Sequence, residues 1–307
     1  MKSDYEAVMS LSLRLANLQT HTGLALGVDT ATGVLNVSAT AAVLGLPAPG
    51  DIDQLLQEGL GAQVTAVLEQ AKKQPHLCVV IPHDQARFAP LVTRPEKIIC
   101  VGFNYREHAA ETGTPISKEP PVFSKYRNAL NHHGGTVSLP TWLDDRFDFE
   151  TELVIVIGKT CKRVPESNVL DYVAGYATGN DISARTRQTA TSQFGAGKWA
   201  DGFAPVGPWL VTRDLVPEPN NLRLTTHVNG RVRQDWNTCD MIFNCRQIIA
   251  YCAKIMTLNP GDIIFTGTPQ GVILGERIPA DQRRWLKAGD EIVSNIQGLG
   301  DLKVTLV

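Results

Sequence analysis

From Lys97 to the carboxyl end, the chain is a succession of short apolar runs bounded by glycine and proline. Runs rich in valine, isoleucine and aromatic residues are typical of β-strands, and glycine and proline mark the turns between them. The runs are KIICVG, ELVIVIG, YVAGYATG, GPWLVT, LRLTTHVNG, GDIIFTG, DEIVSNI and LKVTLV. Helical patterns interrupt them only at 105–112, 181–193 and 242–256. The pattern predicts a β-dominated mixed α+β domain with curled or closed sheets over residues 95–307, and it disfavours a doubly wound nucleotide-binding sheet.

The first ninety residues have a different pattern. An opening amphipathic helix is predicted by apolar residues that repeat at helical spacing, namely Ala7, Val8, Leu11, Leu15 and Leu18. The runs GLALGV and GVLNV, separated by the turn-prone TATG, predict a hairpin. Asp51 is a candidate cap for a short helix, and apolar positions between residues 64 and 71 predict a longer one. We expect a small α+β domain over residues 1–90.

Composition narrows the class of protein. The 307 residues include 29 basic and 31 acidic side chains, and this net charge of −2 argues against a general nucleic-acid binder. No apolar run approaches the ~20 residues that span a bilayer, so no membrane segment is expected. Charges at Asp4, Glu6 and Arg14 interrupt the apolar stretch that a secretory signal needs, so secretion is not expected. The six cysteines lack CxxC spacing, which favours reduced thiols over disulfides or a zinc site. We predict a cytoplasmic protein with reduced thiols.

The motif DFETELVIVIG carries the sharpest chemical signal. In an extended chain Asp148, Glu150 and Glu152 share one face, so two or three carboxylates converge where the apolar run begins. Like charges at a buried position repel unless a cation compensates them. Oxygen-only ligands select hard ions such as Mg²⁺, Mn²⁺ or Ca²⁺. The alternative is a solvated strand face with incidental acids.

Asp181 lies where the strand-like YATGN gives way to the helix-like ISARTRQ. At such a junction an aspartate commonly caps the helix. Together with Glu150 and Glu152 it would instead make a set of three carboxylates for one divalent ion, with positions left for water or substrate. The residue types alone leave both interpretations open.

His108 and Glu111 are three residues apart in the predicted helix 105–112 and therefore lie on one side of it. A carboxylate in that position can orient the imidazole and raise its basicity, which makes His108 a candidate general base. A polar pair on the helix surface is the alternative. The spacing does not match the HExxH zinc signature.

Lys125 in PPVFSKY and Lys198 in GAGKWADG lie among glycine, proline and aromatic residues, where either could hold an anionic substrate. Exposure without function is the alternative for both. GAGKW is not a phosphate-binding loop, because Trp199 follows the lysine where serine or threonine is required. Thr268 in the turn GTPQGV could bind a carboxylate beside exposed amides, although a structural turn is the default expectation.

Taken in order, several motifs resemble the fumarylacetoacetate hydrolase family over about Lys97 to Val307: GFNYREHAAE, PPVFSKY, DFETEL, GNDISARTRQ, KWADGFAPVGP, DMIF and LNPGDIIFTGTPQGV. The resemblance implies a β-sandwich or roll catalytic domain, here preceded by the small amino-terminal domain, and a homodimer. It implies one Mg²⁺ or Mn²⁺ per subunit on Glu150, Glu152 and Asp181. It also implies catalytic and substrate-contacting roles for six further residues: His108, Glu111, Lys198, Lys125, Gln188 and Thr268.

The resemblance implies an enzyme for a small 2-oxo acid and leaves the reaction open. Our leading hypothesis is metal-dependent hydrolysis of a carbon–carbon bond in an acylpyruvate or related 2,4-dioxo acid, with His108 activating a water. The alternatives are an oxaloacetate decarboxylase or tautomerase, a hydroxymuconate-type isomerase or decarboxylase, and a non-catalytic ligand-binding homologue. Departures from the family pattern include Thr151 between the glutamates and Gln270 after the proline. His132 and His133 are expected to shape a glycine-rich loop rather than to line the pocket.

Overall fold

The computed structural model describes residues 11–307, and most of its regular structure is β-strand. The strands are β1 Arg14–Thr20, β2 Gly23–Thr30, β3 Gly33–Asn36, β4 Val80–Ile81, β5 Ile98–Val101, β6 Val122–Lys125, β7 Leu130–Asn131, β8 Thr136–Val137, β9 Phe147–Asp148, β10 Thr151–Ile157, β11 Val173–Asn180, β12 Ser183–Ala184, β13 Ala204–Thr212, β14 Arg223–Val228, β15 Arg231–Asn237, β16 Ile263–Phe265, β17 Glu291–Ile296 and β18 Gly300–Leu306. All eight runs predicted from the sequence after residue 95 form strands. The mixed α+β fold class is therefore confirmed.

The helices are few and short. They are α2 Val37–Leu44, α3 Ile52–Gln57, α4 Gly61–Lys73, α5 Arg106–Glu111, α6 Arg185–Gln188 and α7 Cys245–Ile255. Asp51 caps α3 by accepting a hydrogen bond from the backbone amide of Gln54, as predicted. Asn244 and Gln247 form a capping box at the start of α7. The helix predicted over 181–193 is wrong, because only α6 forms there, and residues 183–184 pair instead with β9.

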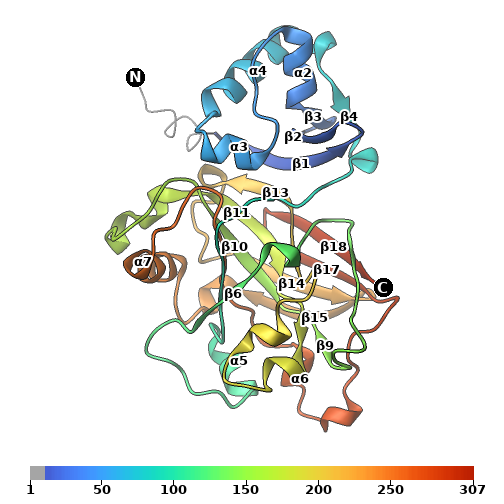
Figure 1. Ribbon diagram of the computed structural model, residues 1–307, viewed down its shortest axis with the longest axis vertical. Helices are drawn as coiled ribbons and strands as arrows, with labels where there is room; N and C mark the ends of the chain where they lie inside the picture. Colours follow the sequence, from blue (N-terminus) through green and yellow to red (C-terminus); the bar gives the residue numbers. More distant parts are fainter. Residues whose placement is uncertain (1–10) are drawn as a thin grey trace.

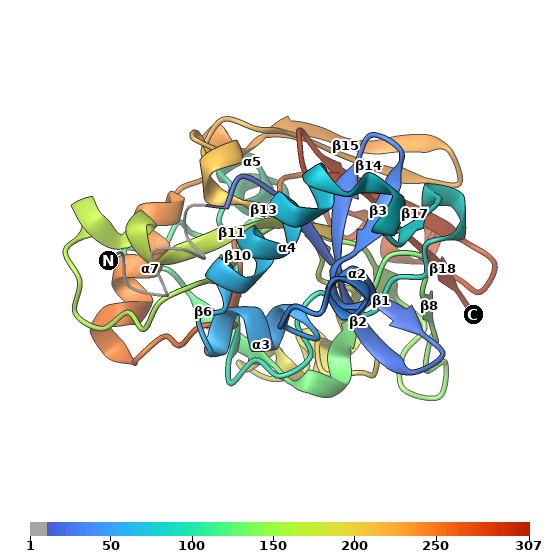
Figure 2. The ribbon, with the colours of Figure 1, turned by 90° about the horizontal axis from the view of Figure 1, so that it is seen from above.

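One 11-stranded sheet runs through the molecule in the order β4-β3-β2-β1-β13-β11-β10-β16-β5-β6, with β7 beside β13. A second sheet has the order β15-β14-β17-β18-β8, and β12 and β9 form a two-stranded sheet. The amino-terminal strands join the large sheet because β1 pairs antiparallel with β13 (Figure 1). Seen from above, α2, α3 and α4 lie over the end of the molecule that β1 to β4 form (Figure 2). The predicted division near residues 90–95 stays a prediction.

The opening helix predicted from Ala7 to Leu18 is wrong where the structure describes it. Ala7 and Val8 lie outside the described residues, whereas Leu15 and Leu18 lie in β1, which pairs with β2 and β13. Four consecutive residues of β1 are buried, from Leu15 to Leu18. A strand covered on both faces lacks the polar and apolar alternation that identifies strands. The predicted hairpin is confirmed as β2 and β3.

Strand β10 lies at the centre of the large sheet and positions the acidic motif. Val154 and Val156 pack into one apolar core, which the amino-terminal helices also enter. Leu153, Ile155 and Ile157 pack into a second core on the other face, under α7. Burial on both faces explains the unbroken apolar run. The acids immediately before this run are thus held at the start of a rigid, fully buried strand.

Two further expectations concern the cysteines and membrane-spanning helices. All six cysteines are free, which agrees with the prediction of reduced thiols. Among residues 11–307 no helix is long and apolar enough to cross a membrane.

Candidate functional site

Glu150, Glu152 and Asp181 are brought together by the pairing of two adjacent strands. In the antiparallel register of β10 and β11, Thr151 lies opposite Asn180, so the residues just before one and just after the other are neighbours. The backbone amide of Asp181 donates to the carbonyl of Glu150 at 2.8 Å. One carboxylate oxygen from each of the three buried acids lies within 4.8 Å of the others. Of the two interpretations of Asp181, the helix cap is wrong: Ala184 occupies the cap position of α6.

Three buried cationic side chains surround these acids. The ammonium of Lys198 donates 2.7 Å hydrogen bonds to Glu150 and Asp181, and a third to the Ser183 hydroxyl. Lys125 donates to the other carboxylate oxygen of Asp181. A guanidinium nitrogen of Arg185 lies 2.6 Å from Glu150. Buried charges need such paired and hydrogen-bonded partners, so the cluster is a connected network of charge-assisted bonds.

The network separates the proton affinities of the two glutamates. Burial alone would raise the pKa of Glu150, but the nearby charges of Lys198 and Arg185 outweigh it and lower this pKa to about 2. Burial and the negative charges of Asp181 and Glu150 raise the pKa of Glu152 well above its ordinary value. One oxygen of Glu152 accepts a 2.7 Å hydrogen bond from the Gly267 amide. Glu152 is therefore the acid of the cluster whose negative charge is least compensated by the protein.

Asp148 does not join this group, so the third carboxylate that the strand pattern allowed does not converge. Its two oxygens accept from the backbone amides of Ile273 and Leu274, each at 2.9 Å. The same carboxylate accepts from Arg185 Nε at 2.9 Å. Burial would lower the pKa of Arg185, but Asp148 and Glu150 raise it above its ordinary value. Asp148 thus fixes Arg185, which in turn fixes Glu150.

His108 and Glu111 form the expected pair on α5. His108 Nδ1 lies 2.8 Å from a Glu111 carboxylate oxygen, and the other oxygen accepts from the Gly271 amide at 3.2 Å. The ring of Phe103 stacks on the imidazole with centroids 5.8 Å apart. These contacts hold the buried His108 ring in one orientation. Because Nδ1 is engaged by the carboxylate, Nε2 is the nitrogen left to exchange a proton with another molecule.

One pocket joins the histidine to the acidic cluster. The predicted residues that line it are His108, Glu150, Glu152, Gln188, Lys198 and Thr268. Its other walls are Val101, Gly102 and three phenylalanines, Phe103, Phe123 and Phe194. Phe194 meets both other rings edge to face, at 5.7 and 5.8 Å between centroids. The pocket therefore combines charged groups with aromatic walls, and Lys198 Nζ lies 5.4 Å from the centroid of the Phe123 ring.

The remaining predicted residues differ in their access to this pocket. Gln188 Oε1 accepts from Arg185 at 2.8 Å, and the Thr268 hydroxyl donates to the Thr151 carbonyl at 2.9 Å. Lys125 is buried behind Asp181 and is not among the described residues that line the pocket. Its contact with substrate stays a prediction that this geometry does not favour.

His132 and His133 lie in a different cleft, with residues 83–88. The ring of His132 is hydrogen-bonded to the His133 carbonyl, and His133 Nδ1 accepts from the Lys303 amide. These bonds to backbone agree with the expectation that the pair shapes a loop.

Comparison with known proteins identifies the family. Residues 97–307 match the family model described as "Fumarylacetoacetate (FAA) hydrolase C-terminal". The chain belongs to the fumarylacetoacetate hydrolase family. The match begins at the predicted start of the second domain and covers the whole pocket described above.

Relatives of this family cover the chain almost from end to end. The human protein "Oxaloacetate tautomerase FAHD2A, mitochondrial" is 37% identical over 279 residues, which are 90% of this chain and 85% of that protein. The structure of fumarylacetoacetate hydrolase from Exiguobacterium antarcticum has a TM-score of 0.81 and 28% identity, and it covers 96% of this chain and 99% of its own. The structure of maleylpyruvate hydrolase from Sphingobium sp. SYK-6, in complex with manganese(II) ion and pyruvate, has a TM-score of 0.75 and 30% identity, covering 96% and 98%. Members thus include hydrolases and a tautomerase.

The donor set of the acidic cluster fits a divalent cation. Its three ligands are all carboxylates, the preferred donors of Mg²⁺ and Mn²⁺. The raised pKa of Glu152 reflects first its burial and then repulsion from Asp181 and Glu150, and a bound cation would offset both. Glu150, Glu152 and Asp181 could therefore hold the ion, with Glu152 contributing the charge that the protein leaves unbalanced.

Proposed function

We propose that this protein is a metal-dependent enzyme that interconverts the keto and enol forms of oxaloacetate or a closely related 2-oxo diacid. The observation that carries the proposal is the position of His108, a carboxylate-oriented base, on the wall of the pocket that Glu150 and Glu152 also line. The name of the human relative, which aligns with 90% of the chain, supports this reaction over the others in the family.

In this proposal Glu150, Glu152 and Asp181 would hold the cation, which would supply positive charge to stabilise the enolate that develops on the substrate. His108 Nε2 removes a proton from the carbon next to the 2-oxo group, and the electron pair of that C–H bond forms the enolate. Return of the proton to oxygen completes the enol. Glu111 stabilises the imidazolium that exists between the two transfers, because its carboxylate lies 2.8 Å from Nδ1.

The second candidate is hydrolysis of a carbon–carbon bond in an acylpyruvate. It is favoured by the Sphingobium relative, whose structure contains manganese(II) and pyruvate, and by the name of the family. His108 would then deprotonate a water that attacks the distal carbonyl, and pyruvate enolate would leave. The pocket residues are the same in both reactions, so the product decides between them.

A screen of purified protein on oxaloacetate, acetylpyruvate and fumarylacetoacetate tests the proposal. The protein is treated with EDTA, dialysed, and assayed before and after addition of Mn²⁺. Faster loss of enol absorbance from oxaloacetate, without release of pyruvate or CO₂, supports tautomerisation. Pyruvate plus a second acid from acetylpyruvate supports hydrolysis, and CO₂ from oxaloacetate indicates a decarboxylase. Absence of metal-restored turnover on all three substrates would refute the enzyme assignment.

The assembly of the protein and its compartment are further proposals. We propose a homodimer, tested by light scattering of the purified protein, and a small-molecule substrate as the main partner. The human relative is named as mitochondrial, so the cytoplasmic location expected from the sequence stays a prediction for this chain.

A further inference from the structure

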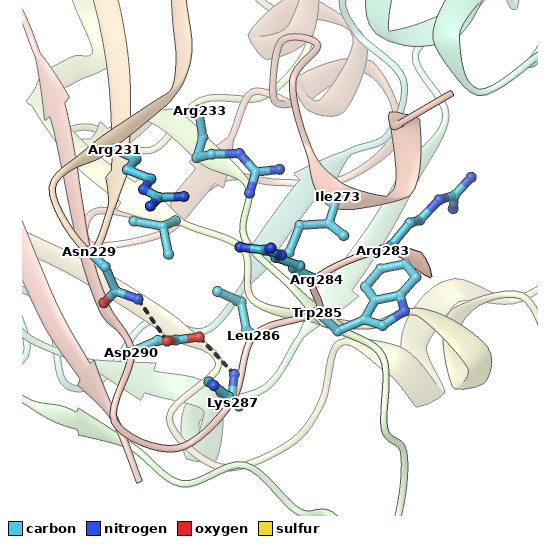
Figure 3. Close-up of a pocket in the computed structure, with 11 residues that line it drawn as sticks. Asn229, Arg231, Arg233, Ile273, Arg283, Arg284, Trp285, Leu286, Lys287 and Asp290 are labelled. Atoms are coloured by element: carbon cyan, nitrogen blue, oxygen red, sulfur yellow. Dashed lines mark hydrogen bonds between the residues drawn. The ribbon is translucent and has the colours of Figure 1, made fainter. Parts of the chain in front are cut away.

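A second hollow lies outside the catalytic pocket, between the β14–β15 hairpin and the segment from Ile273 to Asp290 (Figure 3). It is about 690 Å³ in volume and shares none of its lining residues with the pocket of His108 and Glu150. Pockets that bind small molecules are typically about 300–1,000 Å³. The hollow is therefore large enough for a ligand of its own.

Basic side chains dominate the lining of this hollow, in a protein whose net charge is −2. The cationic residues are Arg231, Arg233, Arg283, Arg284 and Lys287. The guanidinium groups of Arg231, Arg233 and Arg284 gather over the hollow, whereas Arg283 points away beyond Trp285 (Figure 3). Three guanidinium groups thus approach one space from two separate elements.

Protein carboxylates neutralise only part of this charge. Arg233 is paired with Glu276 at its side. Asp290, the acid that lines the hollow, already accepts from the Asn229 amide at 2.8 Å and from the Lys287 backbone at 2.9 Å. Within residues 11–307, the side chains of Arg231 and Arg284 form neither a hydrogen bond nor an ion pair. Two of the three converging guanidinium groups therefore keep all their donors for another molecule.

The floor of the hollow is apolar and held in place. Ile273 and Leu286 are buried, and the Ile273 amide is bound to Asp148 at 2.9 Å. Trp285 is half-buried, and its indole nitrogen donates to the Ala280 carbonyl at 3.2 Å. A floor that is already fixed lowers the entropy cost of binding a carbon skeleton. The hollow thus combines a surface for a carbon skeleton with donors for oxyanions.

We propose that this hollow is a binding site for a small organic anion with two or more carboxylate or phosphate groups. Arginine guanidinium groups match both oxyanions through pairs of parallel hydrogen bonds. Like charges gathered in a concave surface repel each other, and a multiply charged anion relieves that repulsion. Because Arg231, Arg284 and Trp285 line the same hollow, one ligand in it engages both guanidinium groups while its skeleton rests on Trp285.

Isothermal titration calorimetry with citrate and with pyrophosphate tests the site and distinguishes carboxylate from phosphate preference. The test variant is the double replacement R231Q/R284Q, which removes two charges whose side chains hold nothing in the fold. The matched control is K72Q/K73Q, which removes the same charge from the exposed end of α4. Turnover at the catalytic pocket serves as the check that each variant is folded.

The expected result is one-to-one binding of at least one probe, weakened about a hundredfold or more in R231Q/R284Q, which is about tenfold for each arginine, and unchanged in the lysine control. Binding to the wild-type protein should also weaken as salt increases. Failure of the wild-type protein to bind either probe would overturn the proposal. Equal binding by R231Q/R284Q, or equal weakening by K72Q/K73Q, would overturn it as well, since the anion would then bind elsewhere or by diffuse attraction.

Discussion

Lys198 donates a 2.7 Å hydrogen bond to Asp181 from the interior of the acidic cluster, and both side chains are buried. The same ammonium reaches Glu150 at the same distance. Burial would lower the pKa of Lys198, but Asp181 and Glu150 raise it above its ordinary value. A permanent positive charge therefore holds together two acids that would otherwise repel each other.

Replacement of Lys198 by methionine removes this charge while keeping the length of the side chain. Loss of one partner from a buried ion network costs about 3–5 kcal/mol, so the free energy of unfolding should fall by that amount. Added Mn²⁺ should raise the unfolding midpoint of the variant more than that of the wild type, because the cation replaces the missing charge. Thermal unfolding with and without Mn²⁺ measures both effects.

The control for this variant is Lys303→Met, which breaks an exposed pair with Glu291. Exposed pairs contribute little, so its unfolding midpoint and its response to Mn²⁺ should match those of the wild type. Equal behaviour of the two variants would show that the buried network does not hold the acids together.

Arg185→Lys tests the support of Glu150 by Asp148. Lysine cannot bridge both carboxylates with the planar geometry of the guanidinium, so at least one charge-assisted bond is lost. The free energy of unfolding should fall by about 2 kcal/mol, measured by urea denaturation. Arg223→Lys alters an exposed bidentate pair with Asp235, whose two bonds are both 2.7 Å, and should leave the urea midpoint unchanged. Similar losses in both variants would deny Arg185 a special supporting role.

Gly275→Ala tests the position of the proposed catalytic pair, His108 and Glu111, because Gly275 lies against the Glu111 carboxyl group. A Cβ at Gly275 would lie 2.1 Å from the Glu111 carboxyl carbon, the flexible end of that side chain. Glu111 should therefore move away from His108 without unfolding the protein. Displacement of a catalytic group by about 1 Å can cost a hundredfold in rate, and kcat should fall by about that factor.

Steady-state kinetics across pH and a thermal melt measure the effect of Gly275→Ala. At Gly50 an added Cβ meets only Gln54 Oε1, at an ordinary 3.6 Å, so Gly50→Ala is the matched control. A fall in melting temperature with unchanged kcat would mean that the glycine serves the fold and not the histidine.

Much of this site follows from the sequence because local patterns specify it. The glutamates two residues apart before a buried run, and the histidine and glutamate three apart on a helix, keep their relation in any fold with those elements. The two glutamates come close to Asp181 only through the register of β10 and β11. The resemblance to the family implied this group of three acids, whereas strand periodicity alone did not. Local spacing thus predicts which residues close in sequence lie together, and the pairing of β10 with β11 brings the acids of the site into one cluster.

The role of Arg185, strand β1 and the basic hollow could not be predicted from the sequence, because each depends on how distant segments pack together. Arg185 stands inside the motif GNDISARTRQ, but its role comes from contacts with Asp148 and Glu150, 37 and 35 residues away. Strand β1 could not be recognised from the sequence, because a strand buried on both faces lacks the alternation of polar and apolar residues. The basic hollow combines residues near 231 with residues near 284, and the near-neutral composition gave no sign of it.

The most direct test of the central claim measures turnover and Mn²⁺ affinity on the same preparation of His108→Ala, with the exposed His76→Ala as control. Loss of the base should reduce metal-dependent turnover of oxaloacetate, or of the acylpyruvate found active in the screen, by about 10²–10⁴-fold. Mn²⁺ should bind His108→Ala as tightly as it binds the wild type, because the proposed ligands are Glu150, Glu152 and Asp181. Unchanged turnover, or loss of Mn²⁺ binding together with turnover, would contradict a base that acts beside a separate acidic metal site.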